Sequence, residues 1–208
     1  MALRSHGLVT ALGVRVLVRI NLDPVELVRT GRLLLRRWDE SDLAAFFDLY
    51  SREDVVRWLG GHPRRPVATL AEARERMGRW RAHESGLDPP LGRWAVVPGV
   101  AGVPPGPPVG TLPLLPLIDA GEPTGLVEVG WHLHPGHQGQ GLASEAASAV
   151  LALAAEAGIE EVLALTDLDN TASQRVAARL GMQDDGVTGR WFGLTARQYR
   201  KVLRRAGA

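Results

Sequence analysis

The chain has 208 residues, of which 45% are hydrophobic and 23% charged, a balance typical of one globular domain. Its formal net charge is +1, which gives no electrostatic reason to expect nucleic acid or a membrane surface as a partner. Cysteine is absent, which excludes disulfides, thiolate nucleophiles and cysteine-ligated zinc and fits a cytoplasmic protein.

The first 27 residues differ in composition from the rest of the chain. They carry several arginines but no acidic residue before Asp23, and their apolar runs are too short to span a membrane. Asp23 and Pro24 form a natural break. We therefore expect residues 1–27 to be a disordered extension and residues 28–208 to form a single domain.

From Arg32 onward the chain shows the regular patterns of secondary structure. Asp39 and Thr69 are suited to cap helices, because a short polar side chain can accept a hydrogen bond from an N–H of the first turn. Apolar residues then recur at the spacing of a buried helix face. We predict a strand at 32–37, helices at 43–50, 54–59 and 70–84, and strands at 92–97 and 109–117 joined by the loop 98–108.

The segment 125–133 has the clearest alternation in the chain. Apolar residues such as Val127 and Val129 alternate with polar ones such as Glu128 and His132, so one face suits the core and the other a cleft. After it we predict a helix at 142–157, a strand at 161–166, a helix at 171–180, strands at 182–187 and 190–194, and a basic helical tail to Arg205. Strands and helices in this order predict a mixed sheet with helices on its faces.

A glycine-rich turn, Gln138–Ala143, links this strand to the helix that follows it. Its sequence is Gln-Gly-Gln-Gly-Leu-Ala. The two glycines let the backbone approach a ligand closely, and the helix N-terminus adds partial positive charge. A turn of this kind binds phosphate, so we expect a ligand that carries phosphate groups.

Five segments in chain order carry a pattern that occurs together in one family. They are Thr30–Leu43, the strand Val127–Trp131, the turn and helix start Gln138–Ala146, the pair Asn170 and Ser173 with Leu180–Met182, and the closing segment Trp191–Tyr199. Together they resemble the GNAT N-acetyltransferase superfamily, and within it the subgroup that acetylates ribosomal-protein N-termini. The resemblance implies an α/β (mixed α+β) fold with a central, mostly antiparallel sheet of about six to seven strands, helices on both faces, and one acetyltransferase domain.

In that family the turn amides hold the pyrophosphate of acetyl-CoA, which the resemblance implies here as the co-substrate. The cofactor-binding residues it implies are Trp131, His132 and Leu133 on the strand and Gln138, Gly139, Gln140, Gly141, Leu142 and Ala143 in the turn. Asn170 and Ser173 would lie beside the pantetheine arm and its sulfur. The implied reaction is direct attack of a primary amine on the acetyl group.

Acetyl transfer to an amine needs a base, because an alkylammonium group has a pKa near about 10. Glu128 is our first candidate, since it lies on the polar face of the strand that meets the turn. His132 is the alternative base, because its ordinary pKa suits the role. At about 3.3 Å per residue the two lie about 13 Å apart and would not act as one pair. A purely structural carboxylate is the alternative interpretation of Glu128.

The departing thiolate needs a proton donor. Many members of the family carry a tyrosine seven residues after the asparagine, where this chain has Ala177. Ser173 is the nearest available hydroxyl, and we expect it to serve as the donor.

The same residues have other interpretations: a metal site, an oxidoreductase and a regulatory protein. His132, His134 and His137 do not predict a metal site, because no nearby pattern supplies further ligands. The glycines also resemble a dinucleotide-binding fingerprint of an oxidoreductase, but the strand before them alternates and the motif lies far from the chain start. A catalytically weak acyl-CoA-binding or regulatory protein of the same fold is the second alternative.

Several classes of acceptor are compatible with the sequence. A protein N-terminus, a small amine or an antibiotic amine would each suit the chemistry. We expect acceptor specificity to come from residues 54–84, from the loop 98–108 and from the segment around Trp191. A homodimer is compatible with the sequence, and we expect neither nucleic acid nor a membrane as a partner.

Overall fold

A nine-stranded sheet forms the centre of the structure, a computed structural model that describes residues 6–11, 14–19, 26–60, 64–99 and 104–204. The strands are β3 (Glu26–Arg29), β4 (Leu33–Arg37), β5 (Gly92–Pro98), β6 (Gly110–Asp119), β7 (Glu122–Val129), β8 (His132–Leu133), β9 (Glu161–Thr166), β10 (Gln183–Thr188) and β11 (Ala196–Val202). Their order is β10-β11-β9-β7-β6-β5-β4-β3, with β8 beside β6. The pairs are antiparallel except for β7 and β9, which are parallel. The predicted fold class is confirmed, with a larger sheet than expected.

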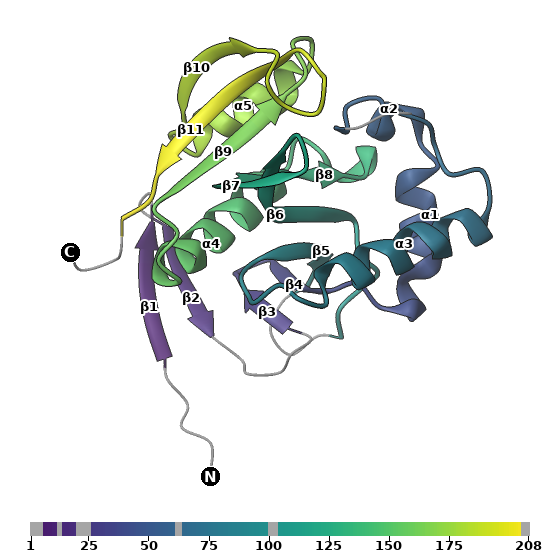
Figure 1. Cartoon of the computed structure of the whole chain (residues 1–208). Helices are drawn as coiled ribbons and strands as arrows, with labels where there is room; N and C mark the ends of the chain where they lie inside the picture. Colours follow the sequence, from purple (N-terminus) through teal and green to yellow (C-terminus); the bar gives the residue numbers. More distant parts are fainter. Residues whose placement is uncertain (1–5, 12–13, 20–25, 61–63, 100–103, 205–208) are drawn as a thin grey trace.

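Helices cover both faces of this sheet, as predicted (Figure 1). They are α1 (Leu43–Tyr50), α2 (Glu53–Val56), α3 (Leu70–Glu84), α4 (Leu142–Glu156) and α5 (Thr171–Arg179), with short 3-10 helices η1 (Glu40–Asp42) and η2 (Pro135–His137). α1 and α3 pack on one face, and α4 and α5 pack on the other. In the described part of the chain, none of the helices has the length and apolar character needed to cross a bilayer.

Strand β4 shows how the two layers are held together. Leu34 packs with Phe46 of α1 and Met77 of α3, whereas its neighbours Leu33 and Leu35 belong to the core under α4. This follows from the alternation of side chains along a strand. All three leucines are at most 2% exposed, and burial of each contributes about 1.5–3 kcal/mol. One run of leucines therefore stabilises both sides of the sheet.

The strand predicted at 125–133 is interrupted in the structure and forms β7 and β8. Both parts pair with β6 in one continuous register, because Val129 lies opposite Leu114 and Leu133 lies opposite Gly110. The interruption therefore leaves the spacing of side chains along this edge unchanged.

The sheet divides in its middle, between β7 and β9. β9 pairs with β7 only at Val127 and Glu128, and beyond Glu128 no described residue of β7 or β8 pairs with β9. Residues 164–166 of β9 pair with β11 alone. Figure 1 shows β9 running with β10 and β11, at an angle to β6 and β7. Backbone N–H and C=O groups on both sides of this division are left without a strand partner.

The prediction for the end of the chain was wrong in two respects. Residues 190–194 are not a strand, because Phe192 and Gly193 have φ of 55° and 64°, which break an extended chain. The basic tail is not a helix but the strand β11, which pairs with β10 on one side and β9 on the other. Arg200 on this strand bonds to Asp185 and Glu161 at 2.7 Å. Pairing with the sheet overrides the helical preference of Arg, Gln and Lys.

The described residues of the N-terminal segment form two strands. Residues 6–11 (β1, His6–Ala11) and 14–19 (β2, Val14–Arg19) form an antiparallel pair separate from the main sheet. The main sheet begins with β3 at Glu26, two residues before the expected boundary at residue 28. The division of the chain into an extension and a domain at residue 28 stays a prediction.

Candidate active site

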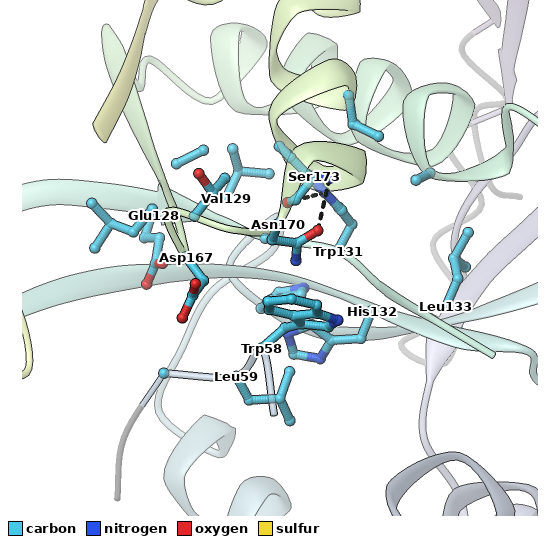
Figure 2. A pocket seen from close by; sticks show the side chains of 18 of the residues that line it. Trp58, Leu59, Glu128, Val129, Trp131, His132, Leu133, Asp167, Asn170 and Ser173 are labelled. Atoms are coloured by element: carbon cyan, nitrogen blue, oxygen red, sulfur yellow. Dashed lines mark hydrogen bonds between the residues drawn. The ribbon is translucent and has the colours of Figure 1, made fainter. Parts of the chain in front are cut away.

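A groove of about 1440 Å³ opens where β7 and β9 separate. Its walls come from β7, β8, β9, α5, the turn before α4, the loop after α2 and the segment between β10 and β11. The predicted site residues that line it are Glu128, Trp131, His132, Leu133, Gln138, Gly139, Gly141, Leu142, Ala143, Asn170 and Ser173. Gln140 is the exception and does not line the groove. Figure 2 shows side chains from the separated strands and from α5 gathered around this opening.

The turn before α4 presents a row of free backbone donors. The N–H groups of residues 139–144 have no acceptor among the described residues, and the first helical bond runs from Glu145 N–H to the carbonyl of Gly141. Gly139 and Gly141 have φ of 74° and 78°, a conformation that glycine adopts without strain. The positive end of the 15-residue helix α4 adds to the same place. These groups suit the oxygens of a phosphate or pyrophosphate.

Arg32 holds this turn from behind, a contact that sequence reasoning missed. Its guanidinium donates to the carbonyl of Gln140 at 3.0 Å and to the carboxylate of Glu145 at 2.7 Å. The same carboxylate accepts bonds from Thr30 Oγ1 and from the Arg32 backbone N–H. Arg32 and Glu145 are 113 residues apart, so no local pattern could reveal the contact. The Gln140 side chain is bound separately, since its Nε2 donates to the carbonyl of Gly136 at 3.2 Å.

Glu128 is a half-buried carboxylate that lines the groove, as predicted. It forms no hydrogen bond or ion pair with the described residues. Burial raises its pKa from 4.5 to about 7, and the positive charge of Arg93 opposes part of this rise. A carboxyl group with this pKa exchanges protons near neutral pH, as a general base requires.

His132 also lines the groove but has the opposite electrostatic character. Burial, together with the charge of Arg93, lowers its pKa to about 4, so the ring is neutral at pH 7. Its Nδ1 lies 3.2 Å from the hydroxyl of Tyr50, which donates to Thr111 Oγ1 at 2.6 Å. A tyrosine hydroxyl has a single proton, so a Tyr50 hydroxyl that donates to Thr111 accepts from the tautomer of His132 that carries its proton on Nδ1 and a lone pair on Nε2. No pattern in the sequence predicts that Tyr50 or Thr111 contacts His132.

Asn170, Ser173 and Trp131 form a connected group on the α5 side of the groove (Figure 2). Asn170 caps α5, since its Oδ1 accepts from the Ser173 N–H at 3.0 Å. The indole of Trp131 donates to Ser173 Oγ at 2.8 Å. Indole N–H is a donor only, so the hydroxyl proton of Ser173 remains available and has no acceptor among the described residues. Ala177, at the position where the family's tyrosine was expected, is fully buried and does not line the groove.

The far end of the groove is bounded by two of the three segments expected to determine specificity. The loop after α2 contributes Trp58 and Leu59, and the segment around Trp191 lies opposite. Arg64 ties this loop to Asp167 at the end of β9, with 2.9 Å between Nη1 and Oδ2. No described residue of the loop 98–108 lines the groove, and residues 100–103 of that loop lie outside the described residues.

The histidines discussed as metal ligands have separate environments. His134 Nδ1 accepts from the Gly136 N–H, and its Nε2 lies 3.2 Å from Asp48. His132 faces Tyr50 instead. Within the described ranges no three His, Asp or Glu side chains converge in the manner of metal ligands.

Comparisons with known proteins agree on one family. A profile of the acetyltransferase (GNAT) domain matches residues 32–183. The uncharacterized N-acetyltransferase YoaA of Bacillus subtilis is 25% identical over 162 residues, which are 77% of this chain and 85% of YoaA.

Solved structures of the same fold include proteins with coenzyme A bound. RimL, a ribosomal L7/L12 α-N-protein acetyltransferase in complex with coenzyme A, has a TM-score of 0.66 at 19% identity, covering 85% of this chain and 97% of RimL. MccE, the microcin C7 self-immunity acetyltransferase in complex with acetyl-CoA and AMP, has a TM-score of 0.70 at 14% identity, covering 88% of this chain and 99% of MccE. At these identities the structures are informative about the fold.

The contact between Arg32 and the turn leads to a prediction about ligand binding. We expect Arg32→Ala to weaken binding of coenzyme A about tenfold, because the turn loses the bonds that fix the Gln140 carbonyl and Glu145. Isothermal titration calorimetry measures this, with Arg29→Ala as the control, since Arg29 pairs with Glu26 outside the groove. Equal dissociation constants for the two variants would contradict the positioning role.

Proposed function

We propose, on the premise that this chain belongs to the GNAT acetyltransferase family, that it transfers the acetyl group of acetyl-CoA directly to a primary amine. The observation that carries the proposal is the combination of free turn amides with the separated strands β7 and β9. The turn supplies donors for phosphate, and the division of the sheet supplies a slot beside unpaired backbone. Both features suit a ligand with a pyrophosphate at one end and an extended, amide-containing arm.

The residues of the groove fit acetyl-CoA along its length. The amides of residues 139–143 would bind the pyrophosphate. The backbone groups of 131–133 that point away from β6 would pair with the pantetheine amides, as an added strand would, beside the Leu133 carbonyl that accepts from Gln138 Nε2 at 3.0 Å. Asn170 and Ser173 would lie beside the arm and its sulfur. Arg175 and Arg179 line the groove, are exposed, and form no ion pair with a described carboxylate, so they suit the 3′-phosphate.

Glu128 is the group best suited to take the proton of the amine. The acceptor nitrogen forms a bond to the acetyl carbon, the carbon–sulfur bond breaks, and the nitrogen loses its proton to a base, directly or through water. At pH 7 about half of the Glu128 side chains are ionised, since the pKa is about 7. His132, with a pKa of about 4, is a weaker base by a large margin. Its Nε2 lone pair suits it to orient a donor group instead.

Ser173 is the group best suited to assist departure of the thiolate. Its hydroxyl oxygen already accepts from Trp131, so its proton can point toward the sulfur. The same bond stabilises negative charge on the oxygen if the proton is transferred. This arrangement provides a donor although the chain has alanine at position 177.

Glu128→Gln is expected to lower kcat/KM for the amine about 100-fold or more, because general base catalysis contributes on this scale. In the wild-type protein kcat/KM should rise with pH through about 7, as Glu128 ionises, and this limb should be absent from the variant. The assay is release of coenzyme A from acetyl-CoA, with Glu122→Gln as the control, since Glu122 is exposed on the same strand. An unchanged rate and pH profile would eliminate Glu128 as the base.

The same carboxylate should reduce stability above neutral pH. Its folded pKa is raised, so the folded state retains a proton that the unfolded state has lost between pH 4.5 and about 7. Relative to high pH, the protonated Glu128 stabilises the folded state. This stabilisation is fully present below pH 4.5 and is lost as the pH rises through about 7. Glu128→Gln should therefore be more stable than wild type at pH 8, by about 1–3 kcal/mol, and equal to it at pH 4. Urea unfolding at both pH values measures the difference, and a destabilised variant at pH 8 would contradict it.

Ser173→Ala is expected to lower kcat about tenfold, because it removes one hydrogen bond to a developing anion. The KM for acetyl-CoA should change less than kcat, and Ser173→Thr should restore most of the rate. Steady-state kinetics at saturating amine measures this, with Ser85→Ala as an exposed control. A rate for Ser173→Ala equal to that of the control would remove Ser173 from the mechanism.

A further inference from the structure

Apolar and aromatic side chains form the end of the groove that lies beyond Glu128. They come from segments far apart in the chain: Trp58 and Leu59 after α2, Ile118 on β6, and Phe192 and Leu194 between β10 and β11. Ile118 and Phe192 are 40% and 47% exposed. This end of the groove therefore offers an apolar surface to whatever enters it.

Phe192 is held in a costly backbone conformation. Its φ is 55°, in the left-handed region that bulky side chains avoid. Strain of this kind persists only where the surrounding structure enforces it, and it concentrates at functional sites. Gly193, the next residue, also has a positive φ of 64°. Burial does not explain the presence of phenylalanine here, because nearly half of its surface is exposed.

Trp191 anchors the segment that carries Phe192. Its side chain is 2% exposed and packs with Leu117 and Leu163. Its indole donates to Gln198 Oε1 at 2.8 Å, and the guanidinium of Arg190 lies 4.3 Å from the ring centre. An anchored neighbour fixes the direction in which Phe192 points.

Phe192 reaches across to the loop after α2. Its Cδ2 lies 3.7 Å from the place where a Cβ on Gly60 would stand. That loop is itself tied to β9 through Arg64 and Asp167. The aromatic ring therefore lies at the mouth of the groove, between two segments that are each fixed to the sheet.

Glu128 is the group through which this end of the groove can bind a cation. Of the arginines nearby, Arg64 pairs with Asp167, and Arg93 shares the Glu84 carboxylate with Arg37, at 2.8 and 3.1 Å. Arg57 stacks on Trp58 at 4.2 Å. The Glu128 carboxylate has no ion-pair partner among the described residues. An ammonium group can therefore approach Glu128 while an apolar group attached to it lies against the aromatic wall.

We propose that the acceptor is a primary amine with an apolar or aromatic side chain on the adjacent carbon, and that Phe192 sets this preference. The proposal rests on the proposed acetyl transfer and names its substrate class. Two sources present such a group, a small α-amino amide and the first residue of a polypeptide, and both expose the same chemistry to the groove.

The test compares leucinamide and phenylalaninamide with glycinamide, and tripeptides beginning with the same residues, by release of coenzyme A. The wild-type protein should favour the apolar acceptors at least about tenfold in kcat/KM. An apolar preference in either set supports the proposal, and the set with the larger kcat/KM identifies the source. In Phe192→Ala the preference should fall to within about threefold through KM, whereas Val187→Ala, an exposed apolar control outside the groove, should retain it.

Failure of the inference differs from failure of the proposed function. Transfer to glycinamide at the rate of leucinamide in the wild-type protein would overturn the preference alone. Binding of acetyl-CoA with transfer to no amine would overturn the acetyl transfer itself.

A second variant isolates the backbone strain. Phe192→Gly and Phe192→Ala lose the same ring contacts, but only glycine adopts the positive φ without cost. The glycine variant should therefore melt about 2–4 °C above the alanine variant, with the same reduced preference for apolar acceptors. The reverse order of melting temperatures would overturn the view that Phe192 is held under strain for function.

Discussion

The short parallel contact between β7 and β9 is the constraint on which the site depends. The strands share two residue pairs and then separate, so backbone donors and acceptors inside the molecule are left to water or to a ligand. The continuous register with β6 holds β8 in place despite the loss of its other neighbour. The turn before α4 lies just past the end of β8, and α5 begins just past the end of β9. The division therefore brings the glycine-rich turn, Glu128 and Ser173 to one opening.

Burial in this opening acts in opposite directions on its two titratable groups. It disfavours the charged form of each, so the pKa of Glu128 rises to about 7 and that of His132 falls to about 4. At pH 7 the Glu128 carboxyl is therefore about half ionised, whereas the His132 ring is neutral and lies 3.2 Å from the Tyr50 hydroxyl. The positive charge of Arg93 opposes part of the rise in the pKa of Glu128 and adds to the fall in the pKa of His132, because it favours a carboxylate and disfavours an imidazolium. A single environment thus separates the roles of two side chains four residues apart.

The sequence was sufficient for the parts of the site that are local in the chain. The turn, its glycines, the alternation around Glu128 and the cap at Asn170 are each encoded within a few residues, and the structure places them at one groove. Contacts between distant segments could not be predicted from local patterns. Examples are the contacts of Arg32 with Glu145, of Tyr50 with His132 and of Arg64 with Asp167. The prediction for the end of the chain was wrong for a related reason. β11 is a strand because β10 pairs with one of its edges and β9 with the other. The helix and strand propensities of its own residues do not reveal those partners. The roles of Glu128 and Ser173 stay predictions.

The backbone amides of residues 139–144 offer the most direct measurement of whether this groove is the acetyl-CoA site. Titration of ¹⁵N-labelled protein with coenzyme A should produce its largest amide shifts in this turn and at Trp131–Leu133, where β8 has no strand partner on the side facing β9. NADH at the same concentration should leave these resonances in place. Shifts confined to other parts of the chain, or equal responses to the two ligands, would contradict the assignment of the turn and the separated strands to coenzyme A.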